Sequence, residues 1–148
     1  MVMLLGLVSC DKKTSFSQYH LVDPAGWSKD SLSIFDVDVE ENTAYDLTIN
    51  IRHTANYPYR NLWLFVDHIT PDSIITSDTI SCDLADLSGK WLGSGSASIY
   101  TLPVVWQQNY VFFTSGIHTF KIRQGMRDNK LLGIQAVGLK LDFHNGKE

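Results

Sequence analysis

The stretch Tyr45–Arg52, with the sequence YDLTINIR, decides the fold, because its odd positions are apolar and its even positions are polar. Successive side chains of a β-strand point to opposite faces, so this alternation predicts a half-buried antiparallel strand. Residues 35–39 alternate in the same way, while Ile34 breaks their phase and predicts a bulge in that strand. Both segments are therefore assigned to antiparallel strands with one face turned toward a core.

The rest of the chain repeats this pattern in short segments that turn residues separate. Leu62–Val66 is apolar at every position, which predicts a central strand covered on both faces, with Trp63 in the core. Further strands are predicted at residues 74–84, 97–105, 110–113, 118–124 and 137–143. Only residues 126–134 are compatible with a helical turn. Short strands at this spacing predict an all-β chain, folded as a single-domain antiparallel β-sandwich or jelly roll.

Length and charge restrict the classes of function. With 148 residues the chain is long enough for one domain with its own core, so folding requires neither a metal nor a disulfide. The formal net charge is −4, and the 12 lysine and arginine residues are scattered along the chain. Binding to phosphate backbones requires concentrated positive charge, so nucleic acid is excluded as a partner.

The N-terminal run Val2–Ser9 is apolar and is followed by Cys10 and a polar segment. An apolar run, a small residue and then cysteine is the pattern of a bacterial lipobox, here Leu7–Cys10, whose cysteine thiol carries diacylglycerol. The run is shorter than the roughly 20 residues of a membrane-spanning helix, and it lacks the basic start of a full secretory signal. An ordinary buried N-terminal strand with a chance cysteine is the alternative.

These features divide the chain into three parts. Residues 1–9 are interpreted as a truncated lipoprotein signal peptide, and residues 10–18 as the lipidated Cys10 with a short polar tether. Residues 19–148 then form the β-sandwich domain. Once Cys10 is acylated, Cys82 has no disulfide partner, and its phase in the strand predicts a small buried side chain with a free thiol.

The sequence contains no recognised catalytic or metal-binding motif. The histidines at positions 20, 53, 68, 118 and 144 lack metal-ligand spacing. His68 follows Asp67 on a predicted strand, so the two point to opposite faces, and His68 is expected to be a satisfied surface or edge residue. Asp36, Asp38 and Glu40 share one strand face, which makes a calcium surface or, as the favoured alternative, a solvated outer face. Gly93–Ser96 lacks the lysine of a phosphate loop and is interpreted as a turn. We therefore predict no enzyme, no catalytic residue, no cofactor and no metal site.

Aromatic residues in the loops provide the candidate binding surface. Tyr57 and Tyr59 flank a proline that stiffens their turn, and Trp91 lies in a glycine-flanked loop. Exposed tyrosine and tryptophan rings stack on sugar rings or anchor protein interfaces, and buried ones fill sandwich cores. Tyr57, Tyr59 and Trp91 are therefore the candidate partner or glycan surface, with pinning of a sandwich corner as the alternative. Trp27 is left open between core and surface.

The segment Asn56–Phe65 resembles the N-x-Y-P-Y-x-N-L-[WF]-L-F segment of the gliding-motility lipoprotein GldH family. Residues 89–95, 120–127 and 133–139 agree with further stretches of that family in the same order. The resemblance covers almost the whole chain, and the short leader is its one departure. It implies a cell-envelope lipoprotein of gliding Gram-negative bacteria and their relatives, linked to the gliding machinery and through it to type IX secretion. It implies no particular reaction.

The sequence therefore predicts a membrane-anchored, non-enzymatic accessory or assembly subunit of that machinery. Its expected partners are the membrane, through the lipid on Cys10, and other envelope proteins, and its expected location is the outer membrane, facing the periplasm. Acylated anchors with two or more chains hold a protein stably at a membrane. A carbohydrate-binding module is the first rival, which a row of exposed aromatic rings on one sheet face would favour. A hydrolase is the second, and it requires a cleft with converging catalytic groups.

Overall fold

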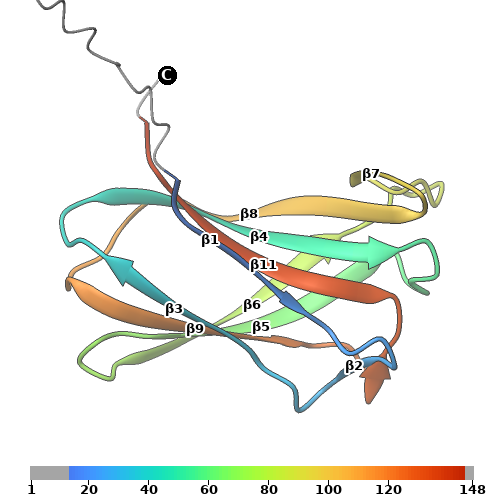
Figure 1. Ribbon diagram of the computed structural model, residues 1–148, viewed down its shortest axis with the longest axis horizontal. Helices are drawn as coiled ribbons and strands as arrows, with labels where there is room; N and C mark the ends of the chain where they lie inside the picture. Colours follow the sequence, from blue (N-terminus) through green and yellow to red (C-terminus); the bar gives the residue numbers. More distant parts are fainter. Residues whose placement is uncertain (1–13, 146–148) are drawn as a thin grey trace, which may run out of the picture.

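A computed structural model describes residues 14–145 and shows two antiparallel sheets packed face to face (Figure 1). The five-stranded sheet has the order β1-β11-β4-β8-β7, and the four-stranded sheet has the order β3-β9-β5-β6. A small ribbon pairs β10 with β2. The strands are β1 (Thr14–Leu21), β2 (Trp27–Ser28), β3 (Ser33–Val39), β4 (Ala44–Thr54), β5 (Asn61–Ile69), β6 (Ile75–Asp83), β7 (Ser94–Ser96), β8 (Ile99–Val111), β9 (Gly116–Gln124), β10 (Lys130–Leu131) and β11 (Ile134–Phe143).

The predicted all-β sandwich is confirmed. Residues 14–145 contain no helix, so none in this part of the chain is long and apolar enough to cross a membrane. The predicted helical turn at residues 126–134 is wrong, because this segment forms bends and the short strand β10.

The core lies between the inner faces of the two sheets. Alternate residues of β4 point into it, and Leu47, Ile49 and Ile51 are fully buried there. Leu62 and Leu64 of β5 meet them from the other sheet and are buried equally well. Burying one such side chain contributes roughly 1.5–3 kcal/mol, so these alternating positions supply the main stabilisation of the fold.

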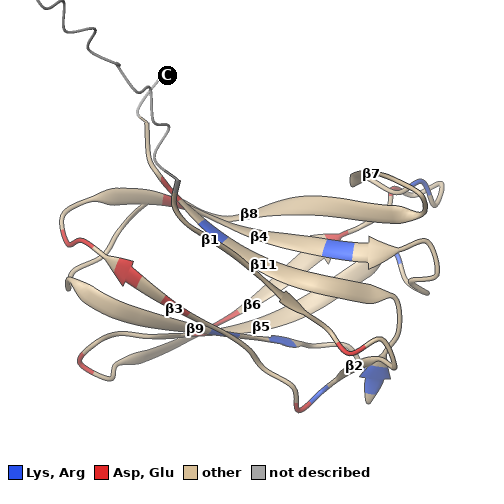
Figure 2. Cartoon of the chain, viewed as in Figure 1, with Lys and Arg blue, Asp and Glu red and all other residues tan. Residues whose placement is uncertain are grey.

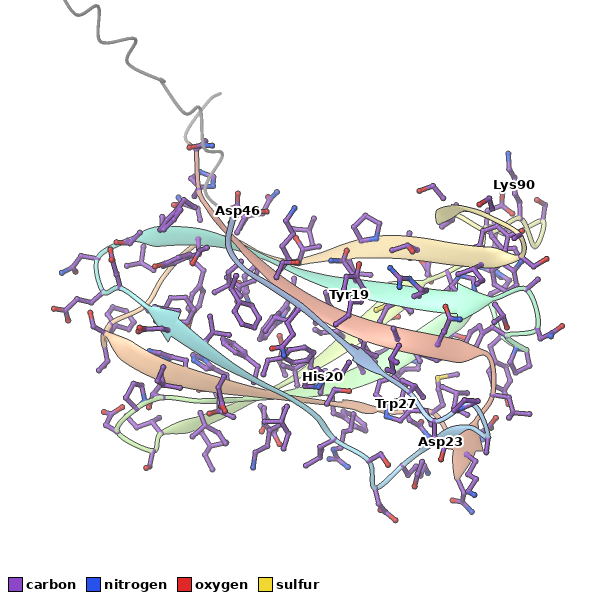
Figure 3. The ribbon with its side chains drawn as sticks, in the orientation of Figure 1. Tyr19, His20, Asp23, Trp27, Asp46 and Lys90 are labelled. Carbon is purple, nitrogen blue, oxygen red and sulfur yellow. The ribbon has the colours of Figure 1, made fainter. Side chains whose placement is uncertain are left out.

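The two long sides of the sandwich differ. On one side the ring of His20 from β1 stacks on Phe35 from β3 at 4.2 Å, and Figure 3 shows His20 between the sheets. On the other side β8 faces β6, where the indole N–H of Trp106 donates a hydrogen bond to the carboxylate of Asp78 at 2.8 Å. Aromatic packing therefore joins β1 to β3, and a polar contact joins β8 to β6.

Two predictions about apolar residues on outer faces are wrong. β3 pairs with β9 without a register shift, so the bulge expected at Ile34 is absent, and this side chain is 43% exposed. Trp63 is likewise 41% exposed on the outer face of β5, although it was expected in the core. Antiparallel sheets leave one face to solvent, so an apolar residue in a strand does not by itself show that this face is covered.

The predicted boundaries also change in three places. β1 begins at Thr14 and pairs with β11, so residues 14–18 of the expected tether lie in the sheet. β8 is one continuous strand where two strands, 97–105 and 110–113, were predicted. The glycine-rich run Gly93–Ser96 contributes the short strand β7 and not only a turn. Edge strands such as β1 and β7 are held by backbone pairing along one side, and their polar sequences conceal them.

Three of the five histidines are buried, and among them is His68, which was expected at the surface or at an edge. His53, His68 and His118 all point into the core. The Nε2 atom of His118 lies 2.7 Å from the carbonyl oxygen of Thr114, which can only accept, so this nitrogen carries the proton. Nδ1 of His118 then accepts from Nε2 of His68 at 2.8 Å. The buried pair is satisfied in its neutral form, as a buried polar group requires.

The predicted state of Cys82 is confirmed. Its thiol is free, and the side chain is 2% exposed on the inner face of β6. Burial raises the pKa of the Cys82 thiol to about 12, so the reactive thiolate is suppressed. Cys10 and the expected signal peptide lie outside the described residues.

The buried histidine pair makes stability depend on pH. Burial, and then the neighbouring His118, lower the pKa of His68 from 6.5 to about 4. Between these values the unfolded chain takes up a proton that the folded chain does not, so stability is complete above pH 6.5 and decreases as the pH falls toward 4. We expect the free energy of unfolding to fall by about 2–3 kcal/mol over this window.

Urea unfolding at a series of pH values measures this loss. In His68→Phe the group that titrates is gone, so we expect a shallower decrease between pH 6.5 and 4 than in the unchanged chain. Equal slopes for both proteins would show that other groups cause the pH dependence.

Candidate functional site

A turn between β4 and β5 carries two of the predicted site residues. The hydroxyl of Tyr57 donates to the carbonyl oxygen of Asn61 at 2.7 Å, and the ring is 3% exposed. Gly133 lies against the backbone of this turn, where an added Cβ would approach the Cα of Tyr57 to 2.6 Å. Its φ of 91° also favours glycine. The turn is therefore held between the start of β5 and the bend before β11, and this fixes the direction in which Tyr59 leaves it.

A second turn, after β9, is held from inside by Gln124. This buried amide accepts from the backbone N–H of Met126 at 2.8 Å and donates to the carbonyl oxygen of Asp128 at 2.7 Å. The backbone N–H of Gly125 donates to the carbonyl oxygen of Trp63 at 2.7 Å, which joins the turn to β5. A Cβ at Gly125 would lie 3.0 Å from the ring of Phe65, so the small residue permits the close approach.

These two turns and β5 enclose a groove of about 460 Å³ on the outer face of the four-stranded sheet. We call it the aromatic groove; it is lined by Tyr59, Asn61, Trp63, Phe65, Thr79, Gly125, Met126, Arg127 and Asp128. Trp63 and Tyr59 are 41% and 38% exposed, respectively. The groove therefore presents several large apolar side chains to solvent at one place.

Polar contacts hold the aromatic rings of the groove in position. The hydroxyl of Tyr59 donates to the carboxylate of Asp128, whose oxygens lie at 2.8 and 3.0 Å. This hydrogen bond raises the pKa of Tyr59 above its ordinary value, so the hydroxyl remains a donor. The guanidinium of Arg123 lies 4.8 Å from the centroid of the Phe65 ring, within the range of a cation–π contact. The rings of Tyr59 and Phe65 are thus held in place by contacts within the chain.

The groove is rich in residue types that are common in protein interfaces. Tyrosine, tryptophan, phenylalanine, methionine and arginine are the residue types enriched at the centres of protein interfaces, and the lining contains all five. Fixed aromatic rings lose little conformational entropy on binding. Within residues 14–145, no group of three or more histidine, cysteine, aspartate or glutamate residues is placed to hold a metal ion. Asp36, Asp38 and Glu40 point to solvent from and beside β3, on the solvated outer face that was the favoured alternative.

The structure separates the three predicted surface residues. Tyr57 belongs to the core, and only Tyr59 lines the aromatic groove. Trp91 is half-buried at the far side of Tyr57, where its ring lies 4.7 Å from that of His53. His53 in turn lies 6.0 Å from Tyr57, and Tyr57 lies 5.9 Å from Tyr59. Trp91, His53, Tyr57 and Tyr59 therefore form a row of ring contacts, and the Tyr59 end of this row faces the groove. Trp27, left open by the sequence, is buried.

Sequence reasoning missed most of the groove. Trp63 was assigned to the core, and Phe65, Met126, Arg127 and Asp128 were not candidates. A signal was present, because two of the segments that resemble the GldH family, residues 56–65 and 120–127, meet here. Their meeting depends on the pairing of β5 with β9, which places Leu64 opposite Gln124.

The groove lies at the opposite end of the sandwich from the first described residue. Thr14 pairs with Asp142 beside the Tyr45 end of β4, and the turn that carries Tyr59 follows the Thr54 end. β4 has 11 residues, so these ends are separated by about 35 Å. Figure 1 shows the start of β1 and the end of β11 together at one corner, far from the end of β9.

Sequence comparisons agree with each other. The family profile described as GldH lipoprotein matches residues 14–141. A gliding motility lipoprotein GldH homolog from Christiangramia forsetii is 34% identical, covering 90% of this chain and 86% of that protein. The gliding motility lipoprotein GldH of Flavobacterium johnsoniae is 35% identical, covering 88% of this chain and 82% of that protein.

Among solved structures, a crystal structure of the infectious bursal disease virus VP2 subviral particle is similar, with a TM-score of 0.41 and 12% identity. The match covers 99% of this chain and 38% of that chain. Similarity at this level assigns no function.

The two tyrosines of the first turn should respond differently to truncation. Tyr57→Ala removes a buried ring and should lower the free energy of unfolding by about 3–5 kcal/mol. Tyr59→Ala removes a partly exposed ring and one hydrogen bond, so we expect a loss of about 1 kcal/mol or less. Thermal and urea unfolding of both variants measure the contrast. A loss of several kcal/mol for Tyr59→Ala would place this residue in the core and remove it from the binding surface.

Proposed function

The chain belongs to the GldH lipoprotein family, and from this we propose that it is a membrane-anchored accessory or assembly subunit of the gliding-motility machinery of the cell envelope. We propose further that it performs no catalysis, that it acts in connection with type IX secretion, and that it lies on the outer membrane, facing the periplasm. The observation that carries the proposal is the aromatic groove. Most of its lining comes from residues 56–65 and 120–127, two of the segments that resemble the GldH family.

The groove supports a docking role because its aromatic rings are clustered, Tyr59 and Trp63 are exposed, and Tyr59 and Phe65 are held by contacts within the chain. Binding energy at protein interfaces is concentrated in a few tryptophan, tyrosine and arginine residues surrounded by weaker contacts. Trp63, Tyr59 and Arg127 supply these residue types in one lining. An envelope protein that packs an apolar side chain against Trp63 and Met126 would bury both. We therefore propose an envelope protein of the same machinery as the partner.

The position of the groove fits a lipid-anchored subunit. With the anchor at Cys10, the chain enters the sandwich at Thr14, and the groove lies about 35 Å away at the other end. A docking site beside the anchor would lie close to the membrane surface, and the membrane would compete with the partner for that space. The observed arrangement leaves the groove free to meet proteins away from the bilayer.

A carbohydrate-binding module is the second candidate function. One specific observation favours it: Tyr59, Trp63 and Phe65 line a single groove on one sheet face, and Asn61 and Asp128 lie beside them. Aromatic faces stack on the apolar faces of sugar rings, and amide and carboxylate groups bind their hydroxyls. The positions of Tyr57 and Trp91 count against glycan binding, because Tyr57 is part of the core and Trp91 packs against the core.

Attachment through Cys10 is tested by fatty-acid labelling. In cells that express the protein with a complete secretory leader, Cys10→Ala removes the only thiol that the lipobox can acylate. We expect loss of palmitate labelling and release of the domain into the soluble envelope fraction. Cys82→Ala is the matched control and should keep both labelling and membrane attachment. Labelling that persists in Cys10→Ala would contradict the proposed anchor.

The docking role is tested by crosslinking the acylated protein in whole cells. Trp63→Ala should leave the melting temperature close to that of the unchanged protein and reduce crosslinks to envelope proteins at least tenfold, as loss of an interface anchor does. Phe113→Ala is the control, because Phe113 is an exposed aromatic residue outside the groove.

Retention of the same variants on purified envelope polysaccharide separates the two candidate functions. Crosslinks that remain in Trp63→Ala, together with lost polysaccharide retention, would replace the subunit proposal by the glycan-binding one. Crosslinks and retention that both remain would remove the aromatic groove from either function.

A further inference from the structure

A second concavity opens between the two sheets on the side where β6 faces β8. It has a volume of about 250 Å³, and we call it the interlayer cavity. Its chemically distinctive lining residues are Trp106, Tyr110, Phe120, Asp78, His68 and Gln107. None of these residues belongs to the aromatic groove.

Three aromatic side chains form much of the cavity wall. The rings of Trp106 and Phe120 meet edge to face, with centroids 5.9 Å apart and an angle of 87° between their planes. Trp106 and Tyr110 come from β8 and are half-buried, while Phe120 comes from β9 and is fully buried. Aromatic side chains pack well against alkyl groups, so this wall fits the apolar part of a small ligand.

A carboxylate lies at the mouth of the cavity. Asp78 pairs with Val66 across the sheet, so its side chain shares the inner face of β6 and β5. One carboxylate oxygen accepts the indole N–H of Trp106 at 2.8 Å, and the other accepts the backbone N–H of Thr79 at 2.9 Å. These bonds fix the carboxylate and leave further acceptor capacity on both oxygens. No lysine or arginine is among the lining residues, so the lining does not neutralise this charge.

The remaining polar lining does not oppose a cation. His68 donates its Nε2 proton to His118, and burial holds the pKa of His68 at about 4, so the ring is uncharged near neutral pH. Gln107 offers an amide oxygen as a neutral acceptor. The lining therefore combines three aromatic rings, one fixed negative charge and neutral acceptors.

We propose that the interlayer cavity binds an alkylammonium group, with the aromatic rings around its alkyl part and Asp78 as its counter-ion. The volume is below the roughly 300–1,000 Å³ of pockets for larger ligands, which restricts the occupant to a short chain. A free primary amine and a lysine side chain of a partner protein carry the same group.

The test is a titration of the full chain, in uncharged detergent, with n-butylammonium chloride. The indole N–H resonance of Trp106, identified by its absence in Trp106→Phe, reports on the site. We expect a saturable shift of this resonance. n-Butanol has nearly the same shape without the charge, and it should shift the resonance weakly and without saturation in the same concentration range.

Asp78→Asn isolates the role of the charge. Asparagine retains an oxygen that accepts the Trp106 N–H, so the site keeps its shape while the counter-ion is lost. We expect n-butylammonium to bind at least about threefold more weakly, the scale of a partly exposed ion pair. Asp83→Asn is the matched control, because it removes the same charge from the outer face of the same strand and should leave the affinity unchanged.

A short peptide with one lysine and blocked ends distinguishes a partner's lysine side chain from a free primary amine as the source of the alkylammonium group. Tighter binding of the peptide than of n-butylammonium supports a partner's lysine as the natural occupant, and tighter binding of the amine supports a free amine. Equal affinity for n-butanol and n-butylammonium, unchanged affinity in Asp78→Asn, or no saturable binding by either cation would each overturn the proposal.

Discussion

The insertion of Tyr57 beneath Gly133 is the constraint on which the arrangement of the molecule depends. The chain leaves β4 in one sheet and enters β5 in the other within six residues, and the buried ring fixes this crossing. The backbone N–H of Thr54 donates to the carbonyl oxygen of Gly133 at 2.8 Å, so the start of the turn is tied to the same glycine. The start of β5 and the direction of Tyr59 follow from this contact.

The sequence predicted the parts of the fold that depend on local alternation. The period of two in β4, β3 and β11 reports directly which face is buried, and the burial of Cys82 followed from the same rule. It could not report what covers the outer face of a strand, and for this reason Trp63 and Ile34 were misassigned. β1 was missed because an edge strand is stabilised by backbone hydrogen bonds, which leave no hydrophobic pattern.

The site was harder to predict than the fold, because it is a property of neighbouring strands. Tyr59 was identified from its place beside a proline, but the residues around it come from three separate segments, residues 61–65, Thr79 and residues 125–128. Their proximity depends on the register of β5 against β9 and on the buried amide of Gln124. Charged residues are not concentrated in one region. Figure 2 shows acidic and basic residues scattered over the sheets, so the charge of each site depends on a few side chains.

The inward-pointing carboxylate of Asp78 affects how β6 can pair with strands of neighbouring molecules. β6 is a nine-residue edge strand that pairs regularly along one side and offers its other side to any extended chain. Proteins concentrated in a two-dimensional layer collide edge to edge far more often than proteins free in solution. A strand added to β6 would cover the sandwich mouth and bury Asp78 away from water, at a high desolvation cost. The residue that gives the interlayer cavity its charge is therefore also an inward-pointing charge on an edge strand, a feature that disfavours edge-to-edge pairing.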